Sequence, residues 1–148
     1  MPSLTLRAYS ALWWLLLPAV LVRLWWRGRK EAGYRRYIAE RLGFCRKFTF
    51  PLIWIHAVSV GETRAAEPLI RALLNKYPQY QILLTHMTPT GRATGAALFG
   101  KDSRVLQSYL PYDTLSMTRR FVQAARPSLC VLMETEVWPA LIHSCHCL

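Results

Sequence analysis

Four short apolar runs, each followed by a segment of helical character, constrain the fold of this chain more than any other feature. The runs occupy residues 51–60, 81–87, 105–110 and 129–133. After the first run, apolar residues recur at spacings of three and four up to Tyr77-Pro78, and Thr88-Pro89 opens a second such segment that ends at Phe99. Strands that alternate with helices form a parallel sheet covered on both faces. The sequence therefore predicts an α/β fold over residues 51–148.

Weaker signals predict the later helices. Phe121, Ala124 and Ala125 fall on one face of a helix, and Pro111-Tyr112-Asp113 before them is predicted to be a turn and helix cap. Trp138-Pro139 is predicted to open the last helix, because proline is favoured in a first turn.

An uncharged apolar segment of 15 residues, 8–22, lies between Arg7 and Arg23. As a helix it is about 22 Å long, less than the ~30 Å of bilayer hydrocarbon, but residues 4–26 are long enough if both arginines extend toward the headgroups. A cleaved signal peptide and a buried core helix are the alternatives. The basic residues follow the apolar run and no Ala-x-Ala site precedes them, so the sequence favours a retained membrane-anchor helix. Whether this helix spans the bilayer or lies in its interface is open, and Pro18 is expected to kink it in either case.

Positive charge is concentrated beside this segment. The chain has 19 Lys and Arg against 8 Asp and Glu, a net charge of +11, and nine of the basic residues lie within residues 23–50. A nucleic-acid-binding protein would spread its charge over the folded surface, whereas a basic cluster next to an apolar helix favours a membrane surface. Residues 27–50 are therefore predicted to be a basic juxtamembrane segment, and no nucleic-acid partner is expected. The positive-inside rule places the folded part in the cytoplasm.

Parallel sheets bind ligands beyond the carboxyl ends of their strands. This rule selects residues 59–64, 88–92, 111–113 and 134–136. Glu62 is the strongest candidate for a general base, because it follows Gly61, which leaves the backbone open to a substrate, and because it begins a helix. The alternative is that Glu62 only complements the helix dipole.

Two further strand-end features could carry chemistry. Glu134 and Glu136 are two residues apart, so in an extended segment they share a face where either could act as a base; solvent-exposed loop acids are the alternative. Thr88, Thr90 and Arg92 could hold a phosphate together with helix N–H groups, but the same residues form an ordinary helix start.

Little in the sequence indicates a metal or a nucleotide cofactor. His143, Cys145, His146 and Cys147 lack the spacing of a zinc finger, and the end of a core helix is the simpler interpretation. No G-x-G-x-x-G or Walker loop is present. We therefore expect no metal and no cofactor. Four cysteines are also too few for a disulfide scaffold.

Five motifs follow one another over almost the whole chain. They are RLWWRGRKEAGYRRYIAERLG at 23–43, HAVSVGE at 56–62, THMTPTGR at 85–92, YLPYD at 109–113 and METEVWP at 133–139. Together they resemble the bacterial 3-deoxy-D-manno-octulosonic acid (Kdo) transferases of lipopolysaccharide synthesis. Several motifs in one order are far more specific than any single motif.

The resemblance implies a membrane-associated glycosyltransferase of the two-lobed GT-B type, with residues 51–148 as a Rossmann-like N-terminal lobe on the acceptor side. Its donor would be CMP-Kdo and its acceptor a lipid A precursor (lipid IVA), at the cytoplasmic face of the bacterial inner membrane. Glu62 would deprotonate the acceptor hydroxyl that attacks the anomeric carbon of the donor. Glu134 and Glu136 would lie near the same cleft as supporting carboxylates.

The remaining site residues are expected on the same motifs. Substrate-binding residues are expected at Ser59, Gly61, Thr63, Arg64, Thr88, Thr90 and Arg92. Contacts to the membrane and to acceptor phosphates are expected at Arg27, Arg29, Lys30, Arg35, Arg36 and Arg41.

This chain also departs from the family pattern. The resembling sequences are considerably longer, and their second lobe supplies most of the CMP-Kdo site. Ala140 stands where asparagine is expected, and His86 where threonine is more usual. We therefore expect a truncated N-terminal lobe that keeps the acceptor side and Glu62. The alternative is a non-catalytic, membrane-tethered module that binds a lipid A precursor without using Glu62.

Overall fold

The computed structural model describes residues 2–134 and 137–147, and the chain divides into two compact units. The sheet unit comprises Arg46–Leu110 and Ala124–Glu136, and the helical unit comprises Met1–Cys45, Pro111–Gln123 and Val137–Leu148. Each unit is therefore built from segments that are far apart in the sequence. The domain boundaries expected at residues 26 and 50 stay predictions.

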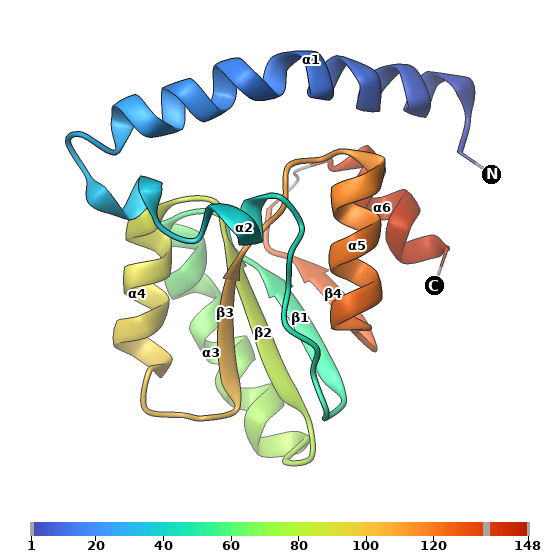
Figure 1. Ribbon diagram of the computed structural model, residues 1–148. Coiled ribbons are helices and arrows are strands. Elements are labelled where there is room, and N and C mark those ends of the chain that lie inside the picture. The colour runs from blue at the N-terminus through green and yellow to red at the C-terminus, as the bar shows by residue number, and fades with distance from the viewer. Residues whose placement is uncertain (1, 135–136, 148) are drawn as a thin grey trace. The chain divides into compact units, whose positions relative to one another are not determined.

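Four parallel strands form the sheet (Figure 1). They are β1 (Leu52–His56), β2 (Gln81–His86), β3 (Val105–Tyr109) and β4 (Leu129–Leu132), in the order β3-β2-β1-β4. In the parallel register, Leu52 lies opposite Gln81, and Ile53 lies opposite Leu129. The predicted α/β fold with a parallel sheet is confirmed, and each strand begins within one residue of its predicted run.

Alternate strand residues build the core of the sheet unit. Side chains two residues apart on β1 and β2 form one apolar face, and residues four apart on α3 (Val60–Lys76) pack against that face, because a strand repeats every two residues and a helix every 3.6. The packed residues are Ile53, Ile55, Ala57, Ile82, Leu84, Ala66, Ile70 and Leu74. The intervening residues Leu52 and Trp54 are also buried. Burial on both faces explains why this strand forms a continuous apolar run in the sequence.

Side-chain caps begin both helices of the sheet unit. Ser59 caps α3, and Thr88 caps α4 (Pro89–Phe99), in each case by accepting a hydrogen bond from the N–H three residues later. α3 ends directly before Tyr77-Pro78, as predicted, and α4 has the predicted bounds.

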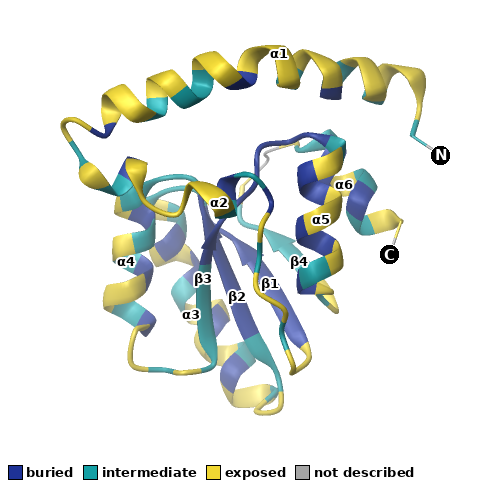
Figure 2. Cartoon of the chain, in the orientation of Figure 1, coloured by how far each residue is buried: buried dark blue, intermediate teal, exposed yellow. Residues whose placement is uncertain are grey.

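The helical unit contains α1 (Leu4–Arg27), the 3₁₀ helix η1 (Ala32–Arg35), α2 (Ile38–Arg41), most of α5 (Leu115–Ala125) and α6 (Pro139–His146). Among the described residues, α1 alone is long and apolar enough to cross a membrane, and it continues without a break through Pro18. Most of its surface is exposed (Figure 2).

Asp113 caps a helix, but not the helix that the sequence predicted. Thr114 caps the helix that follows, because its Oγ1 accepts from Met117 N at 3.2 Å. The carboxylate of Asp113 instead accepts from the first turn of α6, from Ala140 N at 3.2 Å and from Leu141 N at 2.8 Å. The prediction that Pro111-Tyr112-Asp113 supplies the cap of the next helix was therefore wrong, since Thr114 supplies it and the Asp113 carboxylate binds N–H groups 27 and 28 residues away.

A residue of α1 adds a third donor to this carboxylate. Tyr9 Oη donates to Asp113 Oδ2 at 2.9 Å. Burial raises the pKa of Asp113 above its ordinary value, and the three donors oppose that rise. Asp113 thus links α1, near the N-terminus, to α6, the last helix of the chain.

We expect the Asp113→Ala variant to lose about 2 kcal/mol of the free energy of unfolding, because the N–H groups of Ala140 and Leu141 are left without an acceptor. Tyr9→Phe removes one donor and should cost less, about 0.5–1 kcal/mol. Urea denaturation in mild detergent, followed by far-UV circular dichroism, measures both changes. Equal stability of Asp113→Ala and the parent chain would contradict the capping role.

Candidate active site

The strand order of the sheet reverses at one point. From β1 the chain moves to β2 and β3 on one side, and then returns to β4 on the other side of β1. Open α/β sheets bind ligands beyond the carboxyl ends of the two strands at such a switch point, which are β1 and β4 here. Glu62 belongs to the segment after β1, and Glu134, which is exposed, to the segment after β4. Glu136 lies outside the described residues.

Two donors hold the carboxylate of Glu62 in place. Oε2 accepts from the backbone N–H of Val58 at 2.7 Å, and Oε1 accepts from Ser59 Oγ at 2.8 Å. Ser59 Oγ in turn accepts from the N–H of Glu62, an arrangement similar to a capping box. These contacts stabilise the first turn of α3, which is a structural role for Glu62. The same contacts fix the direction of its half-buried carboxylate, which a general base requires.

Open space lies over the backbone next to Glu62. Among the described atoms, a Cβ added at Gly61 would meet only Ser59 Oγ within 4 Å, at 3.9 Å. Gly61 is exposed, so packing does not demand glycine at this position. The prediction that a substrate approaches the backbone here is compatible with this geometry.

Thr63 and Arg64, both expected to bind substrate, differ in exposure. Arg64 is exposed, whereas Thr63 is fully buried and its Oγ1 donates to Ser59 O at 2.7 Å. Thr63 therefore fastens the first turn of α3. The substrate contacts of both residues stay predictions.

The threonine hydroxyl groups at the start of α4 form hydrogen bonds to other groups of the sheet unit. Thr88 Oγ1 accepts from the N–H three residues later and donates to Val58 O, both at 3.1 Å. Thr90, which is exposed, donates to Thr88 Oγ1 at 3.4 Å. The guanidinium carbon of Arg92 lies 4.9 Å from the ring centroid of Tyr109. The phosphate-binding role of Thr88, Thr90 and Arg92 stays a prediction.

Two buried histidines, His56 and His86, end β1 and β2 and were not selected as catalytic or binding residues. A hydrogen bond of 2.8 Å joins His56 Nδ1 and Thr85 Oγ1, and Trp54 Nε1 donates to the same hydroxyl at 2.8 Å. His86 Nδ1 lies 3.0 Å from Ala57 O. Burial lowers the pKa of each histidine from 6.5 to about 4, so both rings are neutral at pH 7. Their shared position as the last residue of a strand is the signal that could have found them.

The ring orientation of His86 is set by Gln107. One orientation of the Gln107 amide satisfies its hydrogen-bonding groups. In it, the amide nitrogen donates to His86 Nε2 and to Arg92 O, each at 2.9 Å, and the amide oxygen accepts from Ala96 N at 3.1 Å. His86 Nε2 is then an acceptor and Nδ1–H is the donor. A Cβ at Gly95 would collide with the Gln107 side chain. Glycine there leaves room for histidine where the family resemblance led us to expect threonine.

The six basic residues expected to meet the membrane or acceptor phosphates all lie in the helical unit. Five are exposed: Arg27, Arg29, Lys30, Arg35 and Arg36. Arg29 and Arg35 both stack on the ring of Trp25, at 4.8 Å each. Arg41 is buried, with 1% of its surface exposed, near Tyr112. In this structure Arg41 therefore lies away from the surface on which the other five are found.

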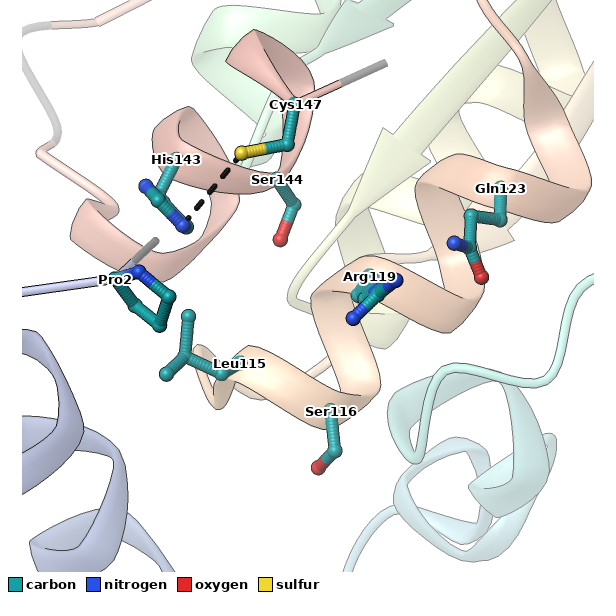
Figure 3. Close-up of a pocket in the computed structure, with 8 residues that line it drawn as sticks. All are labelled: Pro2, Leu115, Ser116, Arg119, Gln123, His143, Ser144 and Cys147. Carbon is teal, nitrogen blue, oxygen red and sulfur yellow. Dashed lines mark hydrogen bonds between the residues drawn. The ribbon is translucent and has the colours of Figure 1, made fainter.

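A hollow of about 560 Å³ lies within the helical unit (Figure 3). It is lined by Pro2, Leu115, Ser116, Arg119, Gln123, His143, Ser144 and Cys147. None of the predicted site residues lines it, and sequence reasoning missed it because its walls come from three separate segments. His143 Nε2 and Cys147 Sγ are 3.6 Å apart. Within residues 2–134 and 137–147, no three His, Cys, Asp or Glu side chains are grouped so that they could hold a metal ion.

The fold and the switch point define a class of protein. A parallel sheet in the order β3-β2-β1-β4, with a carboxylate fixed beyond one of the two strands at its switch point, is the architecture of a Rossmann-like α/β protein that binds a ligand at this edge.

Comparison with known proteins is more specific. A family model described as 3-deoxy-D-manno-octulosonic-acid transferase (kdotransferase) matches residues 36–147. The chain is 43% identical over 138 residues to the 3-deoxy-D-manno-octulosonic acid transferase of Haemophilus influenzae, and 42% identical over 135 residues to that of Bordetella pertussis; the alignments cover 91% and 86% of this chain. A probable mitochondrial 3-deoxy-D-manno-octulosonic acid transferase of Arabidopsis thaliana is 33% identical over 138 residues, which is 92% of this chain.

The chain therefore belongs to the 3-deoxy-D-manno-octulosonic acid transferase family, and the resemblance found in its motifs is confirmed. It spans about a third of the length of these curated relatives, between 30% and 32% of each.

Proposed function

We propose that this chain provides the acceptor-side lobe of an enzyme that transfers Kdo from CMP-Kdo to a lipid A precursor in lipopolysaccharide synthesis. The observation that carries the proposal is Glu62, a carboxylate held by two donors at the switch point of the sheet. Membership of the transferase family supports the choice of donor and acceptor.

In the proposed reaction, Glu62 accepts the proton of an acceptor sugar hydroxyl. The hydroxyl oxygen forms a bond to the anomeric carbon of Kdo as the bond from that carbon to the phosphate of CMP breaks. The electron pair of the broken bond leaves with CMP, and Glu62 later returns its proton to solvent. Val58 N–H and Ser59 Oγ keep the carboxylate in one orientation during this cycle. Glu134 and Glu136 are proposed to support the same cleft.

The lipid acceptor explains the proposed location at the cytoplasmic face of the inner membrane. The apolar helix α1 is proposed to attach the lobe to the bilayer, and the exposed side chains of Arg27, Arg29, Lys30, Arg35 and Arg36 to meet anionic headgroups or acceptor phosphates. Arg41 is not assigned this role, because it is buried.

A transfer assay with a matched pair of variants tests the proposal. Because the chain spans about a third of its relatives, the assay uses a chimera in which this chain replaces the matching part of the Haemophilus influenzae enzyme. Glu62→Gln should lower kcat at least 100-fold, since a general base contributes roughly 10²–10⁴-fold. Glu67→Gln makes the same chemical change on the same helix, where Glu67 pairs with Arg71 at 2.8 Å, and should stay within about twofold of the parent. Mass spectrometry of the lipid detects the added Kdo. Undiminished transfer by Glu62→Gln would overturn the assignment of the base.

The competing function is a membrane-tethered module that binds a lipid A precursor without catalysis. The capping contacts of Glu62 favour it, because they give the carboxylate a structural task of its own. If the chimera transfers no Kdo, while the folded chain binds the precursor equally well with Glu62 and with Gln at that position, the binding module is the better account.

A further inference from the structure

One face of α1 packs against other residues of the helical unit, and we call it the packed face. Ser10 Oγ, which is buried, accepts from Leu115 N at the start of α5 at 3.0 Å. The ring of Trp13 stacks on that of Tyr112, with centroids 5.9 Å apart. One turn further along, Leu17 is 6% exposed and packs in a cluster with Tyr112 and Met117. Together with the bond from Tyr9 to Asp113, these contacts run along more than two turns of the helix.

The opposite face of α1 is an exposed apolar stripe. Because an α-helix turns by 100° per residue, the residues of this stripe project about 180° from the packed face. They include Leu4, Leu15, Val22 and Trp26, which are 67–83% exposed. A large uncovered apolar surface on a folded unit indicates a partner that removes it from water.

Charged groups border this stripe on both sides. Arg7 and Arg23 are exposed and project roughly 80° to either side of its centre. Beyond Arg23, the exposed cations Arg29 and Arg35 stack on Trp25. An apolar stripe with cations and tryptophan at its edges fits the boundary between lipid headgroups and hydrocarbon of an anionic bilayer.

We propose that α1 lies flat in one leaflet of an anionic bilayer, with the Leu15 face in the lipid and the Ser10 face on the protein. This inference rests on the membrane attachment in the proposed function. A helix that crossed the bilayer would carry residues 9–17 into the hydrocarbon, where Asp113, Leu115 and Met117 of the folded unit could not follow. It would also hold Arg7 and Arg23 near the hydrocarbon, because the uncharged segment between them is about 22 Å long against ~30 Å.

Site-directed labelling in bacterial membranes tests the orientation. The four native cysteines, Cys45, Cys130, Cys145 and Cys147, would first be replaced by serine, so that only the introduced cysteine reacts. A single cysteine is then placed at exposed Thr5, near the start of α1, or at exposed Lys101 in the sheet unit as the reference for the folded part. A membrane-impermeant maleimide is applied to inverted vesicles and to spheroplasts.

We expect Thr5→Cys and Lys101→Cys to react from the same side, each at least tenfold faster in inverted vesicles than in spheroplasts. Reaction of Thr5→Cys from the side opposite to Lys101→Cys would overturn the flat orientation and leave the membrane attachment standing. A chain that washes off the membranes would overturn both the attachment and this inference.

The depth of two outward positions gives an independent readout. Leu15→Cys and Val22→Cys lie seven residues apart on the exposed face, so neither change disturbs the core. A fluorophore on each, quenched by nitroxides at known depths in phosphatidylglycerol vesicles, should report depths that agree within about 3 Å for a flat helix. A difference of about 10 Å, which is the rise over seven residues, would overturn the proposal.

Discussion

Acidification from pH 6.5 to pH 4 is expected to lower the free energy of unfolding by about 3 kcal/mol for each of the two buried histidines, His56 and His86. Burial lowers the pKa of each from 6.5 to about 4 in the folded chain. Between these values the unfolded chain binds protons that the folded chain excludes. Stability therefore falls as the pH falls through this window, and it is fully present above pH 6.5.

Urea denaturation at pH 7, 5.5 and 4 in mild detergent measures this loss. His86→Gln removes one of the two titrating groups and should flatten the pH profile by about half. A stability that is constant from pH 6.5 to pH 4 in the parent chain would refute the expectation.

The Gly43→Ala variant is expected to lose about 3 kcal/mol of the free energy of unfolding. Gly43 has φ +87°, a left-handed conformation that costs a side-chain-bearing residue roughly 1–2 kcal/mol. The added Cβ would also collide with the carbonyl oxygen of Met117, a backbone atom that cannot rotate away, and overpacking adds roughly 1–3 kcal/mol.

Gly61→Ala is the matched control for this change. Gly61 has no left-handed φ, and its nearest neighbour for an added Cβ is 3.9 Å away, so its stability should match the parent within about 0.5 kcal/mol. Urea midpoints at pH 7 compare the two variants. Equal midpoints for Gly43→Ala and Gly61→Ala would show that neither strain nor collision matters at Gly43.

The strands and the main helices were predictable because their signals are local. Thr88-Pro89 and Trp138-Pro139 begin helices in the structure as predicted, since proline suits a first helical turn. The first strand was predicted to be longer than it is, because its apolar run extends over residues 51–60. β1 ends at His56, because Ser59 turns the chain into α3 and its hydroxyl caps the new helix.

The features that sequence reasoning missed depend on distant contacts. Arg41 carries the same charge as its exposed neighbours, and nothing in the charge pattern shows that it is buried. The environments of His56 and His86 arise only when β1 and β2 pair. For Glu62, the sequence predicted the place at a strand end, whereas the donors Val58 N and Ser59 Oγ required the folded turn.

The contacts of Tyr9 and Ser10 have a consequence for how the chain is made. Their partners, Asp113 and Leu115, lie 104 and 105 residues further along the sequence. At a synthesis rate of about 5–20 residues per second, roughly 5–20 s pass before those partners emerge from the ribosome. During that interval the residues of α1 are synthesised but their protein neighbours are absent, which leaves the apolar side chains of this segment uncovered. In the membrane attachment that we propose, α1 would therefore reach the bilayer before the fold is complete.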